Sequence, residues 1–528
     1  MFAQLAQKIT LSGKWPHRFL SLFAGLLLTL ALPPYDFLPV GFIAFPTLVW
    51  LLDRPVKHAG KKMLRDALPA FATGWWFGFG YFVGGLWWIG AALLVDAEQF
   101  AWALPLAVVG LPAFLALFYG FAAYLARLFW SHGVGRIFAL AFGFGVAEYL
   151  RSFILTGFPW NSIGYTAMPT PLLMQSAKIV GLTGMNALAV MVFAMPALLV
   201  GKRHRLGGMV FGLLLVVAHL GYGAWQLHQP VEVAATNPHI RIVQPSIAQD
   251  LKWDNAERRS IFERHLSLTA QAPQDGALRP DIIIWPETSV PYILTQTPDA
   301  LARIADVLQD GQLLMVGAVR EEETPQGLNY YNSITVINDQ GFIISSFDKV
   351  HLVPFGEYLP LEGVLRALGL QEVVEMPGGF KAGKSRHSLK IGEKLAILPL
   401  ICYEAIFGNE LDYQGERAGA IVNVTNDAWY GNTPGPYQHF RQAQLRAVEQ
   451  GMPLLRAANN GISAVTDSYG RIIASLNLNE VGVVDAVLPP LRLDVDDKGW
   501  VSRQTWAMIL LLLCGLLAIV YKRKSQRD

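Results

Sequence analysis

The sequence predicts two architectures in one chain: a bundle of about eight membrane-spanning helices and an α/β domain held outside the cytoplasm. Three observations predict this fold class. Of the 528 residues, 53% are hydrophobic and only 16% are charged, whereas a typical soluble protein is roughly a quarter charged. Long apolar runs fill the segment before residue 228, and one more lies near the C-terminus. Between them, residues 228–505 are mixed polar sequence with alternating strand and helix signals.

A helix that crosses a bilayer needs about 20 mostly apolar residues. The predicted spans are residues 19–33, 37–52, 68–94, 102–126, 137–157, 172–200, 208–227 and 506–521. Two prolines, Pro105 and Pro112, make the ends of the fourth span uncertain, so totals of seven and nine spans stay open. The expected domains are a helix bundle at 1–227, a large polar domain at 228–505, and a last span with its tail at 506–528.

The basic residues predict how the chain crosses the membrane, because lysine and arginine gather in cytoplasmic connections. With eight spans and the N-terminus inside, every basic cluster falls on one side. The clusters lie in residues 54–65, 127–136, 202–205 and 522–527. The connections at 33–36 and 95–100, on the opposite side, hold no lysine or arginine. Both termini are therefore predicted in the cytoplasm, and residues 228–505 outside it.

The polar segment reads as an α/β domain, since short β-rich runs alternate with helical stretches. Strands are expected at residues 240–243, 281–285, 313–319, 333–337, 342–347, 395–401, 420–424, 462–467 and 481–487. Helices are expected at residues 255–272, 297–309 and 437–450.

Composition also excludes several function classes. A net charge of +2 is too small to suggest nucleic acid binding. Only two cysteines occur, Cys402 and Cys514, so no disulfide framework organises the fold. The 11 histidines show no His-x-x-x-His spacing and there is no Cys-rich run, so neither a metal nor another cofactor is expected.

Three reactive side chains lie at the ends of predicted strands. Glu287 follows the apolar run 281–285, Lys349 follows the strand at 342–347, and Cys402 follows the strand at 395–401. Functional groups of α/β proteins gather at strand ends, where the scaffold fixes them and leaves them reachable. A thiol near a helix N-terminus and a lysine is expected to favour its thiolate, the nucleophilic form.

Each of these residues also has a structural reading. A lone cysteine at the end of an apolar strand is more often structural than catalytic, since free cysteine is commonly buried. Glu287 fits a helix cap or a solvated turn, and Lys349 fits a surface pair with Asp348. Spacing alone does not show that the three side chains converge, so the residues by themselves leave both readings open.

The order of three motifs carries a family resemblance. Trp-Pro-Glu ends at Glu287, Asp-Lys-x-x-Leu-Val-Pro-Phe-Gly-Glu-Tyr begins at Asp348, and Cys-Tyr-Glu begins at Cys402. This order resembles the nitrilase (carbon–nitrogen hydrolase) superfamily, whose members use a Glu–Lys–Cys triad. With its helix bundle and single C-terminal span, the chain resembles the apolipoprotein N-acyltransferase family over essentially its whole length. The runs at 150–161, 251–254 and 423–431 match that family as well.

The resemblance implies a fold, a reaction and a location. The fold is a nitrilase-like αββα sandwich at 228–505. The reaction moves the sn-1 acyl chain of a phospholipid, typically phosphatidylethanolamine, onto the cysteine as a thioester. The acyl chain then passes to the α-amino group of the diacylglyceryl-cysteine that begins an apolipoprotein, the last step of lipoprotein maturation. The location is the bacterial inner membrane, with the catalytic domain in the periplasm.

The resemblance also implies roles for individual residues. Glu287 is the general base for Cys402 and later for the incoming amine. Lys349 stabilises the oxyanion, with the backbone N–H of Tyr403 as a second donor. The supporting positions are Glu357, which orders the lysine, together with Tyr403 and Glu404. Trp253 matches a position that the family needs for activity or substrate entry.

Two other functions are weighed against this one. A membrane-tethered amidase or nitrilase would share the triad and use water as the acceptor. A transporter with a large outer domain is disfavoured because the spans hold few charges and no obvious repeat. Glu148 and Arg151, one helical turn apart, are expected to pair within the bundle.

Overall fold

The computed structural model describes most of the chain. The described residues are 2–55, 63–200, 205–231, 234, 236–252, 256–273, 278–325, 327–367, 372–374, 379–392, 395–492 and 499–527. Contacts divide the chain into two compact units. The first comprises Met1–Gly90, Trp102–Gln229 and Lys498–Asp528, and the second comprises Ala91–Ala101 and Pro230–Asp497.

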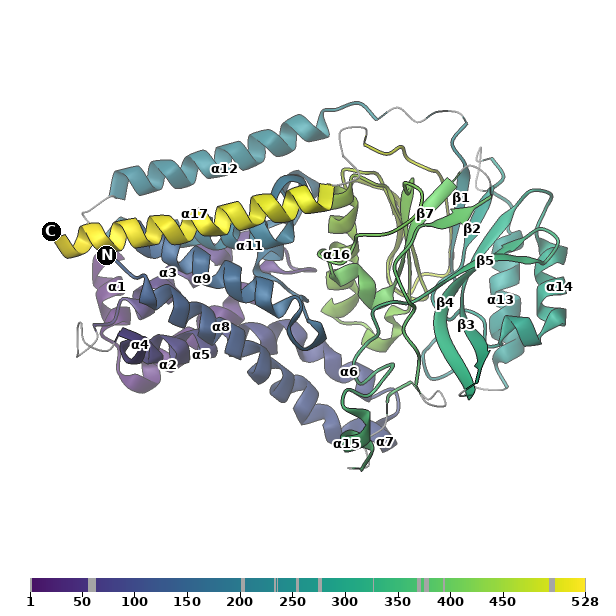
Figure 1. The fold of residues 1–528 in the computed structure, drawn as a ribbon, viewed down its shortest axis with the longest axis horizontal. Helices are drawn as coiled ribbons and strands as arrows, with labels where there is room; N and C mark the ends of the chain where they lie inside the picture. The colour runs from purple at the N-terminus through teal and green to yellow at the C-terminus, as the bar shows by residue number, and fades with distance from the viewer. Residues whose placement is uncertain are drawn as a thin grey trace. The chain divides into compact units, whose positions relative to one another are not determined.

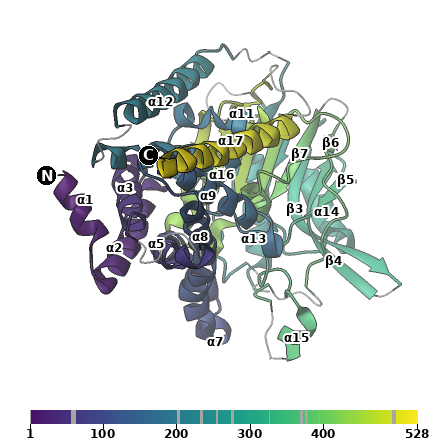
Figure 2. The same ribbon diagram turned by 60° about the vertical axis from the view of Figure 1, so that its left-hand side comes forward.

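The first unit is built of helices (Figure 1). Its longer helices are α2 (Lys14–Leu28), α3 (Gly41–Leu52), α5 (Leu68–Leu86), α8 (Leu111–Leu128), α9 (Gly135–Arg151), α11 (Ala177–Ala194), α12 (Arg205–Leu227) and α17 (Gly499–Arg527). Figures 1 and 2 both show α17 running alongside α9 and α11, and these helices are in contact. Shorter helices include α1 (Phe2–Thr10), α4 (Met63–Asp66) and α10 (Pro171–Met174).

Glycines let the helices of this unit approach closely. A Cβ on Gly25 of α2 would lie 1.8 Å from the carbonyl oxygen of Phe77, and one on Gly80 of α5 would lie 2.0 Å from that of Leu22. Both contacts join α2 to α5, so larger residues there would push the two helices apart. Small residues at helix contacts are typical of membrane bundles, where backbones pack without a hydrophobic driving force between helices.

One buried ion pair was expected in the bundle and is confirmed. The Arg151 guanidinium lies 2.6 Å from Oε2 of Glu148, and the Tyr119 hydroxyl donates to the other oxygen of Glu148 at 2.6 Å. Both charged side chains are almost fully buried. A buried charge needs such partners, because an unpaired one costs several kcal/mol. The pair therefore belongs to the packing of α8 against α9.

Helices suited to a membrane are confirmed, while the count of eight stays a prediction. Each predicted span overlaps a helix. Among the described residues, five helices are long and apolar enough to cross a bilayer: Leu64–Leu93, Ala97–Leu128, Ala177–Val200, Arg205–Leu227 and Ser502–Gln526. Leu38–Leu52 is apolar but shorter. The helices under the remaining two predicted spans, α2 and α9, have 15 and 17 residues.

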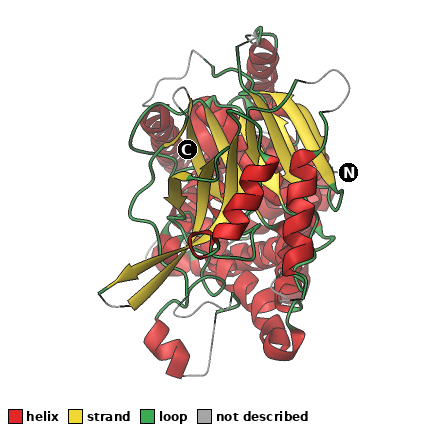
Figure 3. Ribbon diagram, turned by 90° about the vertical axis from the view of Figure 1, so that its right-hand side faces the viewer, coloured by secondary structure: helices red, strands yellow, loops and turns green. Residues whose placement is uncertain are grey.

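The second unit contains two six-stranded sheets (Figure 3). The first has the order β12-β1-β2-β3-β4-β5, and the second has the order β11-β10-β9-β8-β7-β6. The strands of the first are β1 (His239–Gln244), β2 (Ile282–Ile284), β3 (Leu313–Thr324), β4 (Gly327–Asn338), β5 (Ile343–Asp348) and β12 (Gly482–Val487). Those of the second are β6 (Leu389–Ile391), β7 (Leu395–Ile401), β8 (Ala420–Thr425), β9 (Leu454–Ala458), β10 (Ser463–Thr466) and β11 (Ile472–Leu476).

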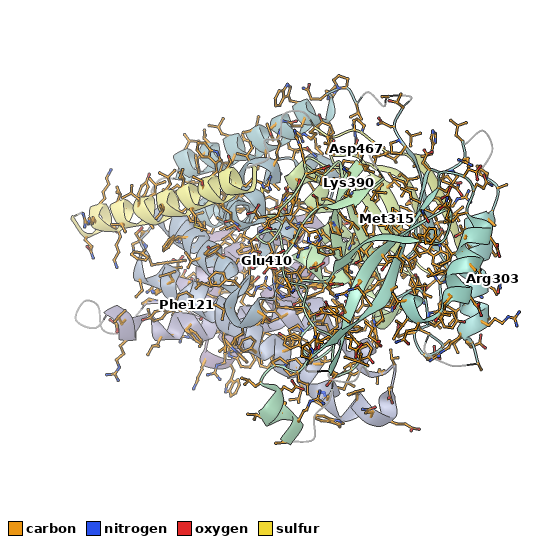
Figure 4. The ribbon with its side chains drawn as sticks, turned by 45° about the vertical axis from the view of Figure 1, so that its right-hand side comes forward. Phe121, Arg303, Met315, Lys390, Glu410 and Asp467 are labelled. Carbon is orange, nitrogen blue, oxygen red and sulfur yellow. The ribbon has the colours of Figure 1, made fainter. Side chains whose placement is uncertain are left out.

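The two sheets pack face to face between layers of helices, because alternate side chains of a strand point to opposite faces of its sheet. In β2, Ile282 and Ile284 join the core between the sheets, while Ile283 faces α13 (Arg258–Ala270) and α14 (Pro298–Val307). The second sheet packs its outer face on α16 (Pro434–Gln450). Figure 4 shows the contrast between Met315, inside the sandwich, and Arg303 on the outer helix α14. The predicted α/β domain is confirmed, with helix, sheet, sheet and helix layers.

Parallel pairing places several strand ends at common edges. β1, β2 and β3 run parallel in the first sheet, and β7, β8 and β9 run parallel in the second. Chain segments that leave the carboxyl ends of such strands meet at one edge of the sheet. Glu287 follows β2 and Cys402 follows β7, so both lie where polar side chains of different segments can converge.

Candidate active site

Cys402 lies directly at the end of a buried strand. β7 ends at Ile401, and the short 3-10 helix η10 (Cys402–Ile406) begins at the cysteine itself. Its φ is 49°, in the left-handed region that costs a non-glycine residue about 1–2 kcal/mol. Only 6% of Cys402 is exposed. The surrounding structure therefore holds the thiol in a sharp turn that an unconstrained chain would avoid.

A buried lysine and two carboxylates lie beside this cysteine. Nζ of Lys349 donates to Oε1 of Glu357 at 2.9 Å and lies 3.7 Å from Oε1 of Glu287. The side chain of Asn332, on β4, donates to both carboxylates, at 2.7 Å to Glu287 and 2.9 Å to Glu357. Glu357 also accepts the backbone N–H of Val353 at 2.8 Å. Cys402 interacts electrostatically with both Glu287 and Lys349, so the three predicted catalytic side chains belong to one cluster.

Burial and charge set the protonation of the nucleophile. Burial raises the pKa of the Cys402 thiol above its ordinary value, and the nearby Glu287 carboxylate raises it further. The positive charge of Lys349 opposes both effects without cancelling them. The thiol is therefore protonated at rest, which differs from the thiolate expected from the sequence. The reason is that burial and the Glu287 carboxylate together outweigh the charge of Lys349, so the cysteine needs a base.

Lys349 keeps its proton throughout. Burial lowers its pKa, but the charges of Glu357, Glu287 and Cys402 outweigh that effect and hold the pKa above the ordinary value for lysine. An ammonium that cannot titrate near neutral pH is a fixed positive charge. Such a charge stabilises a negative oxygen that develops nearby in a transition state.

Glu404 ties the cysteine turn to the lysine segment. Its carboxylate accepts the backbone N–H of Ile401 at 2.8 Å and those of Val350 and His351 at 3.0 and 3.2 Å. It also pairs with Arg386 at 2.8 Å. Although burial opposes its ionisation, Arg386 and these donors lower the pKa of Glu404. A permanently charged, fully buried carboxylate therefore holds the two strand ends together.

Tyr403 packs beside the nucleophile. Its ring lies 5.6 Å from the ring of His351 and 5.0 Å from that of Phe407, and its residue is 4% exposed. The predicted substrate-binding residue Trp253 lies outside the described residues.

Two further polar residues of the site were not predicted from the sequence. One is Asn332, described above. The other is Lys252, whose buried ammonium donates to the backbone oxygen of Glu287 at 3.0 Å. Burial lowers the pKa of Lys252 to about 8, against the opposing pull of Glu287 and Cys402. The sequence held a clue to each residue. Lys252 lies in the run 251–254, which resembles the apolipoprotein N-acyltransferase family, and Asn332 places a polar side chain next to the apolar strand predicted at 333–337.

The charges of the site balance. Two lysines, Lys252 and Lys349, face two glutamates, Glu287 and Glu357. Transfer of the thiol proton from Cys402 to Glu287 would leave that balance unchanged, which matters because net charge in a buried site is costly. Among the described residues, no group of three or more His, Cys, Asp or Glu side chains is placed to hold a metal ion.

Comparison with known proteins identifies the family of the chain. Residues 239–493 match the carbon–nitrogen hydrolase family, and residues 24–195 match the apolipoprotein N-acyltransferase N-terminal domain. An apolipoprotein N-acyltransferase of Brucella suis is 60% identical over 533 aligned residues, covering 99% of each chain. The chain belongs to the apolipoprotein N-acyltransferase family. A second member, from Rhizobium rhizogenes, is 52% identical over 524 residues and covers 98% of each chain.

The family membership confirms the resemblance and the class of activity. The chain is an N-acyltransferase with a carbon–nitrogen hydrolase domain, and the transporter hypothesis is set aside. A carbon–nitrogen hydrolase from Helicobacter pylori aligns with 52% of this chain and 94% of its own, with 13% identity and a TM-score of 0.36.

Proposed function

We propose that this enzyme transfers the sn-1 acyl chain of a phospholipid, typically phosphatidylethanolamine, to an apolipoprotein through a thioester on Cys402. The acceptor is the α-amino group of an N-terminal diacylglyceryl-cysteine. One observation carries the proposal. Lys349, buried between Glu357 and Glu287, lies beside a cysteine that is held in a left-handed turn at a strand end. That arrangement supplies a nucleophile, a base and a fixed cation in one buried cluster.

In the first half-reaction, Glu287 removes the proton of the Cys402 thiol as sulfur attacks the ester carbonyl of the phospholipid. The carbonyl oxygen becomes negative, and Lys349 and the backbone N–H of Tyr403 stabilise it. The intermediate collapses with cleavage of the ester C–O bond. The departing glycerol oxygen takes the proton from Glu287 and leaves as a lysophospholipid.

In the second half-reaction, the neutral α-amine of the acceptor attacks the thioester carbonyl. Glu287 accepts the amine proton, and the same donors stabilise the second oxyanion. The C–S bond breaks, and the sulfur recovers a proton from Glu287. The product is an amide at the lipoprotein N-terminus. A thioester suits this sequence, because it forms readily from an ester and still reacts with an amine.

A bundle of membrane helices suits substrates that keep their acyl chains in a bilayer. Withdrawing a lipid into water costs roughly 0.8 kcal/mol for each exposed CH₂ group, so a soluble enzyme would face a large barrier. We therefore place the enzyme in the bacterial inner membrane, with residues 1–227 and 506–528 in the bundle and both termini in the cytoplasm. Residues 228–505 then form the catalytic domain in the periplasm, as the distribution of basic residues indicates.

The fate of the acyl chain tests this function. Purified full-length enzyme is mixed with phosphatidylethanolamine labelled at the sn-1 chain and with a diacylated lipopeptide. The proposal predicts a labelled amide on the lipopeptide and one lysophospholipid for each amide formed. Cys402→Ala should abolish both products. Label released as free fatty acid in the presence of saturating lipopeptide would instead favour the hydrolase, which uses water as its acceptor.

A further inference from the structure

A second group of buried charges lies behind Cys402, outside the cluster described above. It consists of Asp427, which follows β8, His439 on α16 and Arg456 on β9. None of the three side chains is exposed to solvent. Nδ1 of His439 lies 2.8 Å from Oδ1 of Asp427, and the Arg456 guanidinium donates to Oδ2 at 2.7 Å. Three charged or titratable groups buried together are costly to fold, which suggests a role beyond packing.

The group reaches the nucleophile through its main chain. Nε2 of His439 lies 3.1 Å from the backbone carbonyl oxygen of Cys402. Because a carbonyl oxygen only accepts hydrogen bonds, Nε2 carries the hydrogen and donates it. The imidazole ring therefore holds one face of the peptide unit that joins Cys402 to Tyr403.

Holding that carbonyl also orients the N–H on the other side of the same peptide. A trans peptide is planar, and its C=O and N–H point in opposite directions. With the Cys402 oxygen directed at His439, the Tyr403 N–H is directed away from α16. That N–H is the second oxyanion donor of the proposed function. A hydrogen bond to the C=O also polarises the peptide and strengthens its N–H as a donor.

The rest of the group fixes His439 in place. With its hydrogen on Nε2, His439 accepts a hydrogen bond at Nδ1 from Arg456, 3.2 Å away, and Asp427 holds that arginine in place. Arg456 also donates to the side chain of Asn423. Burial opposes ionisation of Asp427, but the Arg456 charge outweighs it and lowers the pKa of Asp427 to about 2. The Thr425 hydroxyl donates to Asp427 at 3.1 Å.

Close packing against Asp427 leaves this arrangement little freedom. A Cβ on Gly461 would lie 2.2 Å from Oδ2 of Asp427, the oxygen that pairs with Arg456. Any larger residue at that position would displace the carboxylate. The contact of α16 with η10 brings the histidine to the cysteine turn, and α16 is visible beside β7 in Figure 1.

We propose that His439, fixed by Asp427 and Arg456, is a positioning residue that aims the Cys402–Tyr403 peptide so that its N–H meets the oxyanion of each half-reaction. The inference rests on the proposed thioester at Cys402. It assigns the buried Asp–His–Arg group to transition-state stabilisation, acting through the main chain of the nucleophile.

Two reactions of the same thiol separate this role from a merely structural one. Acylation by phospholipid passes through an oxyanion, whereas alkylation by iodoacetamide forms a C–S bond with loss of iodide and no oxyanion. Both rates are measured by mass spectrometry of the Cys402 peptide in detergent-solubilised full-length enzyme. We expect His439→Leu to slow acylation about 10²–10³-fold, the usual effect of losing one oxyanion donor, and to leave alkylation nearly unchanged.

Matched variants complete the experiment. His439→Gln keeps an N–H donor near the carbonyl and should recover most of the lost acylation rate. His265→Gln removes another buried imidazole, which bonds within its own helix; it should not change the ratio of acylation to alkylation. The inference is overturned if His439→Leu acylates like the wild type, or if acylation and alkylation fall together in both His439 variants. A wild-type enzyme that forms no adduct with phospholipid would overturn the proposed function itself.

Discussion

Lys349 lies closer to Glu357 than to Glu287: its Nζ is 2.9 Å from the first carboxylate and 3.7 Å from the second. The two glutamates are therefore not equivalent. Glu357 also receives the N–H of Val353, so it is the more tightly held of the two carboxylates. Glu287 is held less tightly by the lysine, which suits its proposed role of accepting the proton of Cys402.

Because the two glutamates are held differently, we expect the loss of each carboxylate to have a different effect. Glu287→Gln keeps the shape of the side chain but cannot accept a proton, so acylation of Cys402 should fall about 10²–10⁴-fold, the range for a general base. Glu357→Gln should slow acylation about 10–100-fold, because it acts through the orientation of Lys349. Single-turnover acylation measured by mass spectrometry compares the two. Equal losses for both variants would contradict the assignment of distinct roles.

The buried lysine should also matter to folding. Lys349→Met leaves Glu357 buried without its cation, and losing one partner of a buried pair costs about 3–5 kcal/mol. Thermal unfolding in detergent should therefore shift to lower temperature. The double variant Lys349→Met/Glu357→Gln should regain much of that stability yet stay inactive, since the oxyanion cation is still missing. Recovery of activity in the double variant would show that Lys349 is only structural.

The lowered pKa of Lys252 predicts that the rate of acylation falls at alkaline pH. Its pKa of about 8 means that the ammonium is present below this pH and lost above it. The groups that act on it are Glu287 and Cys402, and it in turn acts on His265. If the charge is needed to balance the site, acylation should decline as pH rises through about 8. Lys252→Arg should move that decline to higher pH, and an unchanged pH profile would reject the charge-balance role.

The lowered pKa of Lys252 also makes the stability of the fold depend on pH. The folded chain gives up this proton at about pH 8, whereas the unfolded chain keeps it to about 10.5. Between those values the unfolded state binds more protons, so the contribution of Lys252 to stability rises with pH. A comparison of wild type and Lys252→Met by thermal unfolding from pH 8 to 10.5 measures this slope, which should vanish in the variant.

Glu404 is predicted to act by holding the cysteine turn and the segment after Lys349 in place. Glu404→Gln removes the charge that pairs with Arg386 and weakens its bonds to the N–H groups of Ile401 and Val350. We expect a lower unfolding temperature and slower acylation together. Arg386→Met should lower stability similarly, because it leaves the buried Glu404 carboxylate unpaired. Normal stability in both variants would mean that this pair does not hold the cysteine turn.

The sequence was sufficient for the elements with strong patterns. The nine predicted strands are all present, because apolar β-rich runs bounded by turns are distinctive. Three further strands lie among the described residues and were not predicted. β9 (Leu454–Ala458) contains the buried Arg456, a charge that breaks its apolar pattern, and β6 (Leu389–Ile391) has only three residues. The exposed β11 (Ile472–Leu476) also lacks a long buried run.

The site was predicted in part. The motifs identify Glu287, Lys349 and Cys402 as candidates, but only their approach in space shows them as one cluster. Asn332 and Lys252 act through contacts between distant segments, which residue patterns along one strand do not show. The sequence also could not predict the protonated thiol, because its raised pKa depends on how deeply Cys402 is buried and how close Glu287 lies.

In the proposed reaction, Cys402 carries the acyl chain between donor and acceptor. The most direct test of this role is a two-stage experiment on the full-length enzyme. Enzyme is first incubated with labelled phospholipid alone, and the Cys402 peptide is analysed by mass spectrometry; diacylated lipopeptide is then added. We predict a hydroxylamine-labile acyl adduct on Cys402 that disappears as an equal amount of lipopeptide amide forms. Continued amide formation while Cys402 stays unmodified would show that the acyl chain does not pass through this thiol.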